Sequence, residues 1–136
     1  MNSAISRTLI EVPIALRWRD LDAFNHVNNS TFLTYLEEAR LTWFARIDGP
    51  WFAESYVPVV AATTVNYRAQ LAWPGQIVVG LSCARLGNSS LTLEHRIVDA
   101  ANLEKVYSDG SVVLVWIDPA NGKAVPLPEA VRRACQ

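Results

Sequence analysis

Residues 30–47, STFLTYLEEARLTWFARI, contain the longest helical pattern in this chain of 136 residues. Apolar side chains recur there at steps of three and four residues, which places them on one face of an α-helix: Phe32, Leu36, Ala39, Trp43 and Ile47, widened by Leu33, Tyr35 and Phe44. Asn28, Asn29 or Ser30 can cap the start, and Asp48-Gly49-Pro50 ends the pattern. At 1.5 Å per residue the helix measures about 27 Å, enough to cross a whole β-sheet.

Strand patterns flank this helix, one before it and four after it. Residues 11–19 alternate with a period of two, and Pro13 within them favours a sheet edge or a strand beginning. The later candidates are residues 57–68, 76–86, 91–98 and 104–117, and residues 128–134 can form a last helical turn or two. Short connections favour antiparallel hairpins, although order in the sequence need not be order in space.

This order of elements predicts an α+β fold, with one antiparallel sheet and a single helix on one face. The length suits one core, so residues 1–136 are expected to form a single domain. Residues 57–65 and 112–117 are apolar in both alternating sets of positions, so both faces of the sheet carry apolar side chains. One helix covers only one face, and the pattern therefore predicts an oligomer.

Composition narrows the range of functions. The formal net charge of −1 gives no support for binding to nucleic acid or to an anionic membrane surface. No apolar run approaches the roughly 20 residues that span a bilayer, and residues 1–9 lack the apolar core of a signal peptide, so a cytoplasmic protein is expected. Cys83 and Cys135 are expected to be reduced thiols, and the isolated His26 and His95 give no metal-binding spacing.

The segment with the most chemistry is residues 17–29, RWRDLDAFNHVNN, directly before the helix. It gathers acids, amides and one histidine next to a helix N-terminus. That end of a helix carries free backbone N–H groups and a partial positive charge, which favour a carbonyl oxygen or an anion. A carboxylate beside such a site indicates hydrolytic chemistry.

The motifs Asp20-Leu21-Asp22-Ala23, His26-Val27-Asn28-Asn29 and residues 32–40 resemble those of hotdog-fold acyl-CoA thioesterases of the 4-hydroxybenzoyl-CoA thioesterase type. Gly87-Asn88-Ser89-Ser90 and Trp116-Ile117-Asp118-Pro119 agree, and the resemblance covers about residues 12–134. It implies a five-stranded antiparallel sheet wrapped around one long helix. It also implies dimers that join sheets edge to edge, active sites between protomers, and dimers that often pair into tetramers.

The resemblance further implies a catalytic role for Asp22, as a nucleophile that forms a mixed anhydride or as a general base on water. The Asn29 N–H would polarise the thioester carbonyl, and His26 is a further catalytic candidate. Asn28, Ser89 and Ser90 are candidates for substrate binding. Some relatives have histidine where Asn29 stands; an amide is no base, so acid–base work falls on Asp22. No metal or organic cofactor is expected, because coenzyme A or an acyl-carrier protein is part of the substrate.

Other interpretations of the same residues stay open. The protein could hydrate or dehydrate an enoyl thioester, or bind an acyl group or coenzyme A without catalysis. Asp20 is expected to be structural, Asn28 and Asn29 to cap the helix, and His95 to be a sheet residue. A medium or long fatty acyl or an aryl acyl group is the expected substrate, with Trp51-Phe52-Ala53-Glu54 near the acyl end.

Overall fold

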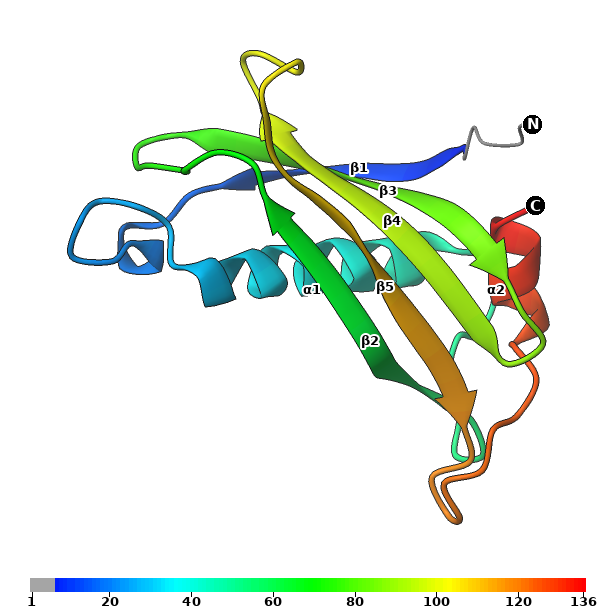
Figure 1. Ribbon diagram of the computed structural model, residues 1–136. Coiled ribbons are helices and arrows are strands. Elements are labelled where there is room, and N and C mark those ends of the chain that lie inside the picture. Colours follow the sequence, from blue (N-terminus) through cyan, green and yellow to red (C-terminus); the bar gives the residue numbers. More distant parts are fainter. Residues whose placement is uncertain (1–6) are drawn as a thin grey trace.

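The computed structural model describes residues 7–136 and shows a five-stranded antiparallel sheet with one long helix packed across one face (Figure 1). The strands are β1 (Thr8–Ala15), β2 (Val57–Tyr67), β3 (Gln76–Leu86), β4 (Ser90–Asp99) and β5 (Val106–Ile117). The long helix is α1 (Asn29–Arg46); a short 3-10 helix, η2 (Trp18–Asp20), precedes it, and α2 (Glu129–Ala134) follows the sheet. The fold predicted from the sequence is confirmed.

The strands are ordered β1-β3-β4-β5-β2 across the sheet. Only β3, β4 and β5 follow one another both in sequence and in space. β2 pairs with β5, so the chain crosses the sheet between β2 and β3 and leaves β1 and β2 as the two edges (Figure 1). Pro13 lies in β1, in agreement with the edge position expected for a residue that cannot donate a ladder hydrogen bond.

The core lies between the sheet and α1. The apolar stripe of the helix is buried as predicted, including Phe32, Leu36, Ala39 and Trp43. It meets alternate side chains of three strands, all nearly inaccessible to solvent: Ile77, Val79, Leu81, Leu91, Leu93, Ile97, Leu114 and Trp116. Leu33, which the pattern placed in the stripe, is 46% exposed because it lies on the helix face turned away from the sheet.

The first strand is shorter and earlier than the alternation over residues 11–19 predicted. β1 ends at Ala15, and Trp18 is 71% exposed on η2 instead of buried in a strand. The Asp20 carboxylate accepts the backbone N–H of Arg17 at 3.0 Å and turns the chain away from the sheet. A side-chain hydrogen bond thus competes with strand pairing and prevails.

Asp20 anchors the segment between β1 and α1. Its side chain is only 5% exposed, and Oδ2 accepts the Tyr35 hydroxyl of α1 at 2.7 Å. Burial raises the pKa of this carboxyl, but the hydrogen bonds from Tyr35 and Arg17 outweigh it, and the pKa lies below its usual value. The Asp20 carbonyl accepts the Asn28 N–H at 3.0 Å. Asp20, where the loop before α1 begins, thus also holds Asn28, where that loop ends.

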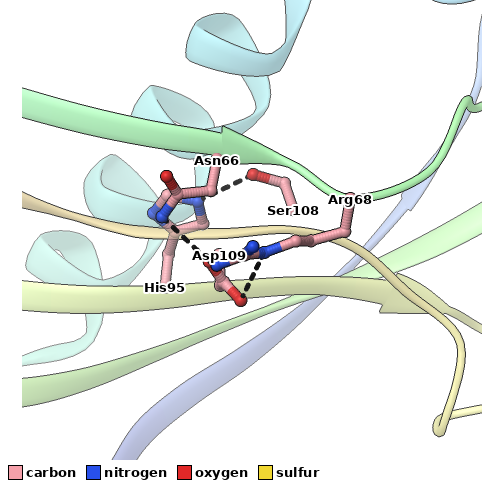
Figure 2. A network of polar contacts seen from close by, with 5 residues as sticks. All are labelled: Asn66, Arg68, His95, Ser108 and Asp109. Atoms are coloured by element: carbon pink, nitrogen blue, oxygen red, sulfur yellow. Dashed lines mark hydrogen bonds and ion pairs between the residues drawn. The ribbon is translucent and has the colours of Figure 1, made fainter.

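A second polar network fixes the end of β2 (Figure 2). The Arg68 guanidinium binds Asp109 of β5 at 3.0–3.2 Å, and the Asn66 amide donates to the same carboxylate at 3.1 Å. Tyr67 points to the opposite face, where its ring packs on Phe32 at 5.1 Å. Its hydroxyl donates to the Asn29 carbonyl at 3.0 Å, so the network holds β2 against the start of α1.

His95 is a buried sheet residue, as predicted. It lies in the same alternating set of β4 as buried Leu93 and Ile97 and is 5% exposed. Its Nε2 lies 3.1 Å from the Ser108 hydroxyl of β5 (Figure 2). Burial lowers the pKa of the imidazole to about 4, against the weaker opposing effect of Asp109.

The buried imidazole makes stability depend on pH. Its pKa of about 4 lies below the ordinary 6.5, so between these values the unfolded chain takes up a proton that the folded chain does not. The contribution of His95 to the free energy of unfolding is therefore complete above about pH 6.5, and up to about 3 kcal/mol of it is lost toward pH 4. We expect the free energy of unfolding to fall less between pH 7 and pH 4.5 in His95→Gln than in the wild type, as measured by urea unfolding at both pH values. An equal loss in both proteins would contradict this.

Tyr35→Phe removes the hydroxyl from the buried Asp20 carboxylate. We expect the free energy of unfolding to fall by about 1–3 kcal/mol, because a buried acceptor loses a partner. Tyr107→Phe is the matched control: its hydroxyl donates at 2.7 Å to Asp99, a carboxylate that reaches solvent. Denaturant titration should show the smaller loss in the control; the reverse order would refute the anchoring role of Asp20.

Candidate active site

The loop that carries Asp22 is a tight turn closed around that carboxylate. Asp22 Oδ1 accepts the backbone N–H groups of Phe24 at 2.8 Å and His26 at 3.1 Å. The Asp22 N–H in turn donates to the His26 carbonyl at 2.8 Å, and Asn25 completes the turn with a positive φ of 61°. Both side-chain hydrogen bonds fall on one oxygen, so the loop is fixed while the carboxylate keeps a second oxygen for chemistry.

The same hydrogen bonds set the ionisation of Asp22. The N–H groups of His26 and Phe24 hold the pKa of the carboxyl below its usual value, because they stabilise the negative form. The residue is exposed in the single chain, so burial opposes this little. Asp22 is therefore ionised at neutral pH, as both a nucleophile and a general base must be.

The start of α1 lies directly after this turn. Asn28 is the N-cap, and its side-chain oxygen accepts the Ser30 N–H at 3.0 Å, which confirms the predicted cap. Asn29 is the first helical residue, one position earlier than predicted. Its N–H belongs to the first turn, where no carbonyl of the same helix can accept it. The Tyr67 hydroxyl donates to the Asn29 carbonyl and so holds the next peptide, between Asn29 and Ser30.

A cavity of about 480 Å³ brings together Asp22, His26 and Asn29, the three residues predicted to be catalytic. Its other lining residues come from the loop, α1, the end of β2 and the connection after it: Phe24, Val27, Phe32, Tyr67, Arg68, Ala69, Gln70 and Leu71. Sequence reasoning did not place Tyr67 at this site. About forty residues separate it from Asn29, and only the pairing of β2 with β5 brings it there.

The candidate binding residues Ser89 and Ser90 lie elsewhere. They are found where β3 connects to β4, at the opposite end of the sheet from the Asp22 loop (Figure 1). The Ser89 carbonyl accepts the Trp116 N–H at 2.9 Å, and the Ser90 carbonyl accepts the Gly87 N–H at 2.8 Å. Within one chain they do not share the cavity of Asp22. Asn28 adjoins the cavity as the helix cap, and substrate binding by all three stays a prediction.

A second hollow, of about 360 Å³, lies between α1 and β2. Trp51 lines it and stacks on Phe44 with ring centroids 4.6 Å apart, while Phe52 beside it is 54% exposed. The Trp116 indole donates to the Trp51 carbonyl at 2.9 Å and fixes this segment. The segment that the sequence placed near an acyl end thus forms an apolar depression, separate from the cavity of Asp22.

Over residues 7–136, no three side chains of histidine, cysteine, aspartate or glutamate gather where they could hold a metal ion. None of the helices described there has the length and apolar character to cross a membrane.

Comparison with known proteins shows the family. A family model described as the thioesterase-like superfamily matches residues 16–135. The chain is 27% identical over 125 residues to the long-chain acyl-CoA thioesterase FadM of Escherichia coli K12, covering 90% of this chain and 94% of FadM.

Solved structures agree with this match. Protein XC229 of Xanthomonas campestris is 50% identical, with a TM-score of 0.77 over 83% of this chain and 96% of that chain. A thioesterase of Thermus thermophilus, solved with coenzyme A and Zn, is 36% identical, with a TM-score of 0.79 over 94% and 92% of the two chains. The family match spans nearly the whole fold, including the Asp22 loop and the start of α1, and the chain belongs to the thioesterase-like superfamily.

Proposed function

We propose that this protein hydrolyses acyl-CoA thioesters to a free acid and coenzyme A, with Asp22 as the reactive carboxylate. The observation that carries the proposal is the shared cavity: an ionised carboxylate, fixed by two backbone N–H groups, lies with the first residue of α1. The names of FadM and of the coenzyme A complex from Thermus thermophilus support the substrate class.

In the proposed reaction, the thioester carbonyl oxygen accepts the Asn29 N–H at the positive end of α1. A donor of this kind stabilises the developing oxyanion by roughly 3 kcal/mol. In one route Asp22 attacks the carbonyl carbon, which expels the thiolate, and water then hydrolyses the resulting mixed anhydride to the free acid and Asp22. In the other, Asp22 removes a proton from a water that attacks the carbonyl carbon, and the tetrahedral intermediate collapses with loss of the thiolate. Both routes require the ionised carboxylate that the loop stabilises.

The surroundings of the cavity favour an apolar acyl group. Phe24 is 80% exposed in the single chain, and Phe32 and Leu71 lie in the lining beside it. We therefore keep a medium or long fatty acyl or an aryl acyl group as the proposed substrate. Coenzyme A or an acyl-carrier protein would leave as the thiol.

Hydrolysis is favoured over hydration of an enoyl thioester by the way Asp22 and His26 interact. Asp22 accepts the backbone N–H of His26, and the imidazole takes no part in this hydrogen bond, which shapes the loop. Hydration normally uses an Asp–His side-chain pair on a differently spaced loop. A protein that only binds the acyl or coenzyme A group remains the second candidate.

Asp22→Asn tests the chemistry. The amide oxygen can still accept the N–H groups of Phe24 and His26, but it is neither a base nor a nucleophile. We expect kcat/KM for thiol release from the best of a panel of acyl-CoAs to fall by at least about a hundredfold.

The matched control is Asp99→Asn, because Asp99 Oδ1 also holds a turn, through the N–H groups of Ala101 and Asn102. It should keep wild-type turnover. Equal loss in both variants, or wild-type turnover in Asp22→Asn, would refute the assignment. Acyl-CoA binding without turnover in the wild type would favour the binding protein.

We further propose that the active form is a dimer in which β2 strands pair edge to edge. β2 is an edge strand of eleven residues, and most of its length is exposed. An edge that long and that apolar is a template for another strand unless a partner covers it. Exposed Val60, Leu41 and Phe52 continue this surface around the second hollow. Pairs of such dimers would give the tetramer.

Val60→Asp tests the dimer, because Val60 is 51% exposed on β2. We expect a buried, unpaired carboxylate in the interface to dissociate the dimer at micromolar concentration and to lower turnover. Light scattering after size exclusion gives the mass. Leu103→Asp, at a residue 58% exposed on the β4–β5 connection, is the control and should keep the wild-type mass. A wild type that is monomeric, or equal masses in all three proteins, would refute the interface.

A further inference from the structure

A cation lines the cavity of Asp22 without pairing with that carboxylate. Arg68, which directly follows β2, belongs to the wall of the cavity together with Asp22 and Asn29. Its ion pair is with Asp109 of β5, at 3.0 Å. Within residues 7–136, Asp22 forms no ion pair. The proposed reaction uses Asp22 and Asn29, and it gives the Arg68 guanidinium no part in the chemistry.

Asp109 holds one edge of the Arg68 guanidinium and leaves the other edge free. Figure 2 shows the two side chains in contact. Nε of Arg68 donates to both carboxylate oxygens at 3.2 Å, and Nη2 donates to Oδ1 at 3.0 Å. A guanidinium carries five N–H groups. In the part of the chain that the structure describes, those on Nη1 and the second one on Nη2 have no hydrogen-bond partner.

The free edge is fixed in position, because Asp109 is itself held. The Asn66 amide donates to Asp109 Oδ1 at 3.1 Å. The hydrogen bonds from Arg68, and then from Asn66, hold the pKa of the Asp109 carboxyl below its usual value, so the pair stays charged at neutral pH. The Arg68 side chain is 56% exposed, so a ligand can reach it. A side chain that is already held loses less conformational freedom when it binds a ligand.

We propose that the free edge of Arg68 binds a phosphate group in the thiol half of the substrate, which makes Arg68 a specificity-determining residue. This inference rests on the proposed hydrolysis of acyl thioesters. Coenzyme A and the arm of an acyl-carrier protein share a phosphate ester at the end of their pantetheine, and coenzyme A adds the phosphates of its nucleotide. The apolar part of the lining, with Phe32 and Leu71, suits the acyl half instead.

The chemistry of the guanidinium matches a phosphate. Parallel N–H groups on Nη1 and Nη2 can donate to two oxygens of one phosphate, while Nε stays on Asp109. Because Arg68 is exposed, the bound phosphate keeps part of its hydration, which avoids the cost of burying a charge. The phosphate takes no part in the reaction at the carbonyl carbon. Its contact therefore stabilises bound substrate and transition state equally and acts on KM, with little effect on kcat.

The test compares Arg68→Met with the wild type on three thioesters of one acyl group: acyl-pantetheine, which has no phosphate, acyl-4′-phosphopantetheine and acyl-CoA. We expect kcat/KM for acyl-CoA to fall at least about tenfold more than kcat/KM for acyl-pantetheine, through a higher KM. Loss of the contact between Arg68 and Asp109 affects all three thioesters alike, so it cancels in this ratio.

Two further variants separate charge and folding from phosphate binding. Arg46→Met removes the same charge at an exposed residue of α1, roughly 25 Å along the helix from Asn29, and should keep the wild-type ratio. Arg68→Lys can keep the ion pair with Asp109 but has no second edge. It should have a higher thermal midpoint than Arg68→Met and still lose most of the ratio. A wild-type ratio in Arg68→Lys would overturn the assignment to the free edge.

The three thioesters also identify the phosphate. A loss that is already present with acyl-4′-phosphopantetheine assigns the contact to the phosphate that coenzyme A shares with a carrier protein, and a loss confined to acyl-CoA assigns it to the nucleotide. Equal losses with all three thioesters, or an unchanged kcat/KM in Arg68→Met, would overturn the proposal. Titration calorimetry with coenzyme A and with pantetheine measures the same preference without turnover. Absence of turnover would thus refute the hydrolysis alone, whereas equal changes in the two affinities would refute the role of Arg68.

Discussion

The hydrogen bond between the buried Asp20 carboxylate and the Tyr35 hydroxyl is the constraint on which the rest of the site depends. A buried charge is costly unless it is paired and hydrogen-bonded, so the chain must bring Arg17 and Tyr35 to it. Meeting that requirement ends β1, forms η2 and attaches the following loop to α1. The Asn28 N–H on the Asp20 carbonyl then determines where the helix begins.

Two aspartates separated by one residue therefore have opposite tasks. Asp20 is turned into the core, and its oxygens are used for side-chain contacts with Tyr35 and Arg17. Asp22 is turned outward, and backbone N–H groups of its own loop stabilise it. The anchoring of Asp20 makes the position of Asp22 possible. Because Asp20 attaches the loop rigidly to α1, the Asp22 carboxylate stays ionised next to the helix N-terminus without being buried in the single chain.

Much of the fold followed from the sequence, because helix and strand periodicities are local properties. α1 begins and ends within one residue of the prediction, and β3 has the predicted bounds. The first strand was predicted, but its bounds were wrong, because the alternation through Trp18 carries no information about the hydrogen bonds of Asp20. The turn and helix start at Asp22, His26 and Asn29 were predictable for the same local reason.

What the sequence could not supply was the spatial order of the strands. That Tyr67 lies beside Asn29 follows from a contact between segments tens of residues apart. Ser89 and Ser90 show the same limit, because their separation from Asp22 within one chain depends on which end of the sheet each turn occupies. A structural role for Asp20 was predictable, whereas its partner on α1 was not.

The pairing of β2 with β5 also determines when β2 can fold during synthesis of the chain. Asn66 and Arg68 are held by Asp109, and within residues 7–136 no earlier strand pairs with β2. A ribosome that has translated the Asp22 loop and α1 has therefore made the Asp22 carboxylate without its cavity. The wall of that cavity can form only after β5 has emerged and the long loop between them has closed, a step that costs chain entropy. The cavity of Asp22 therefore forms late in synthesis, when the sheet that encloses it is nearly complete.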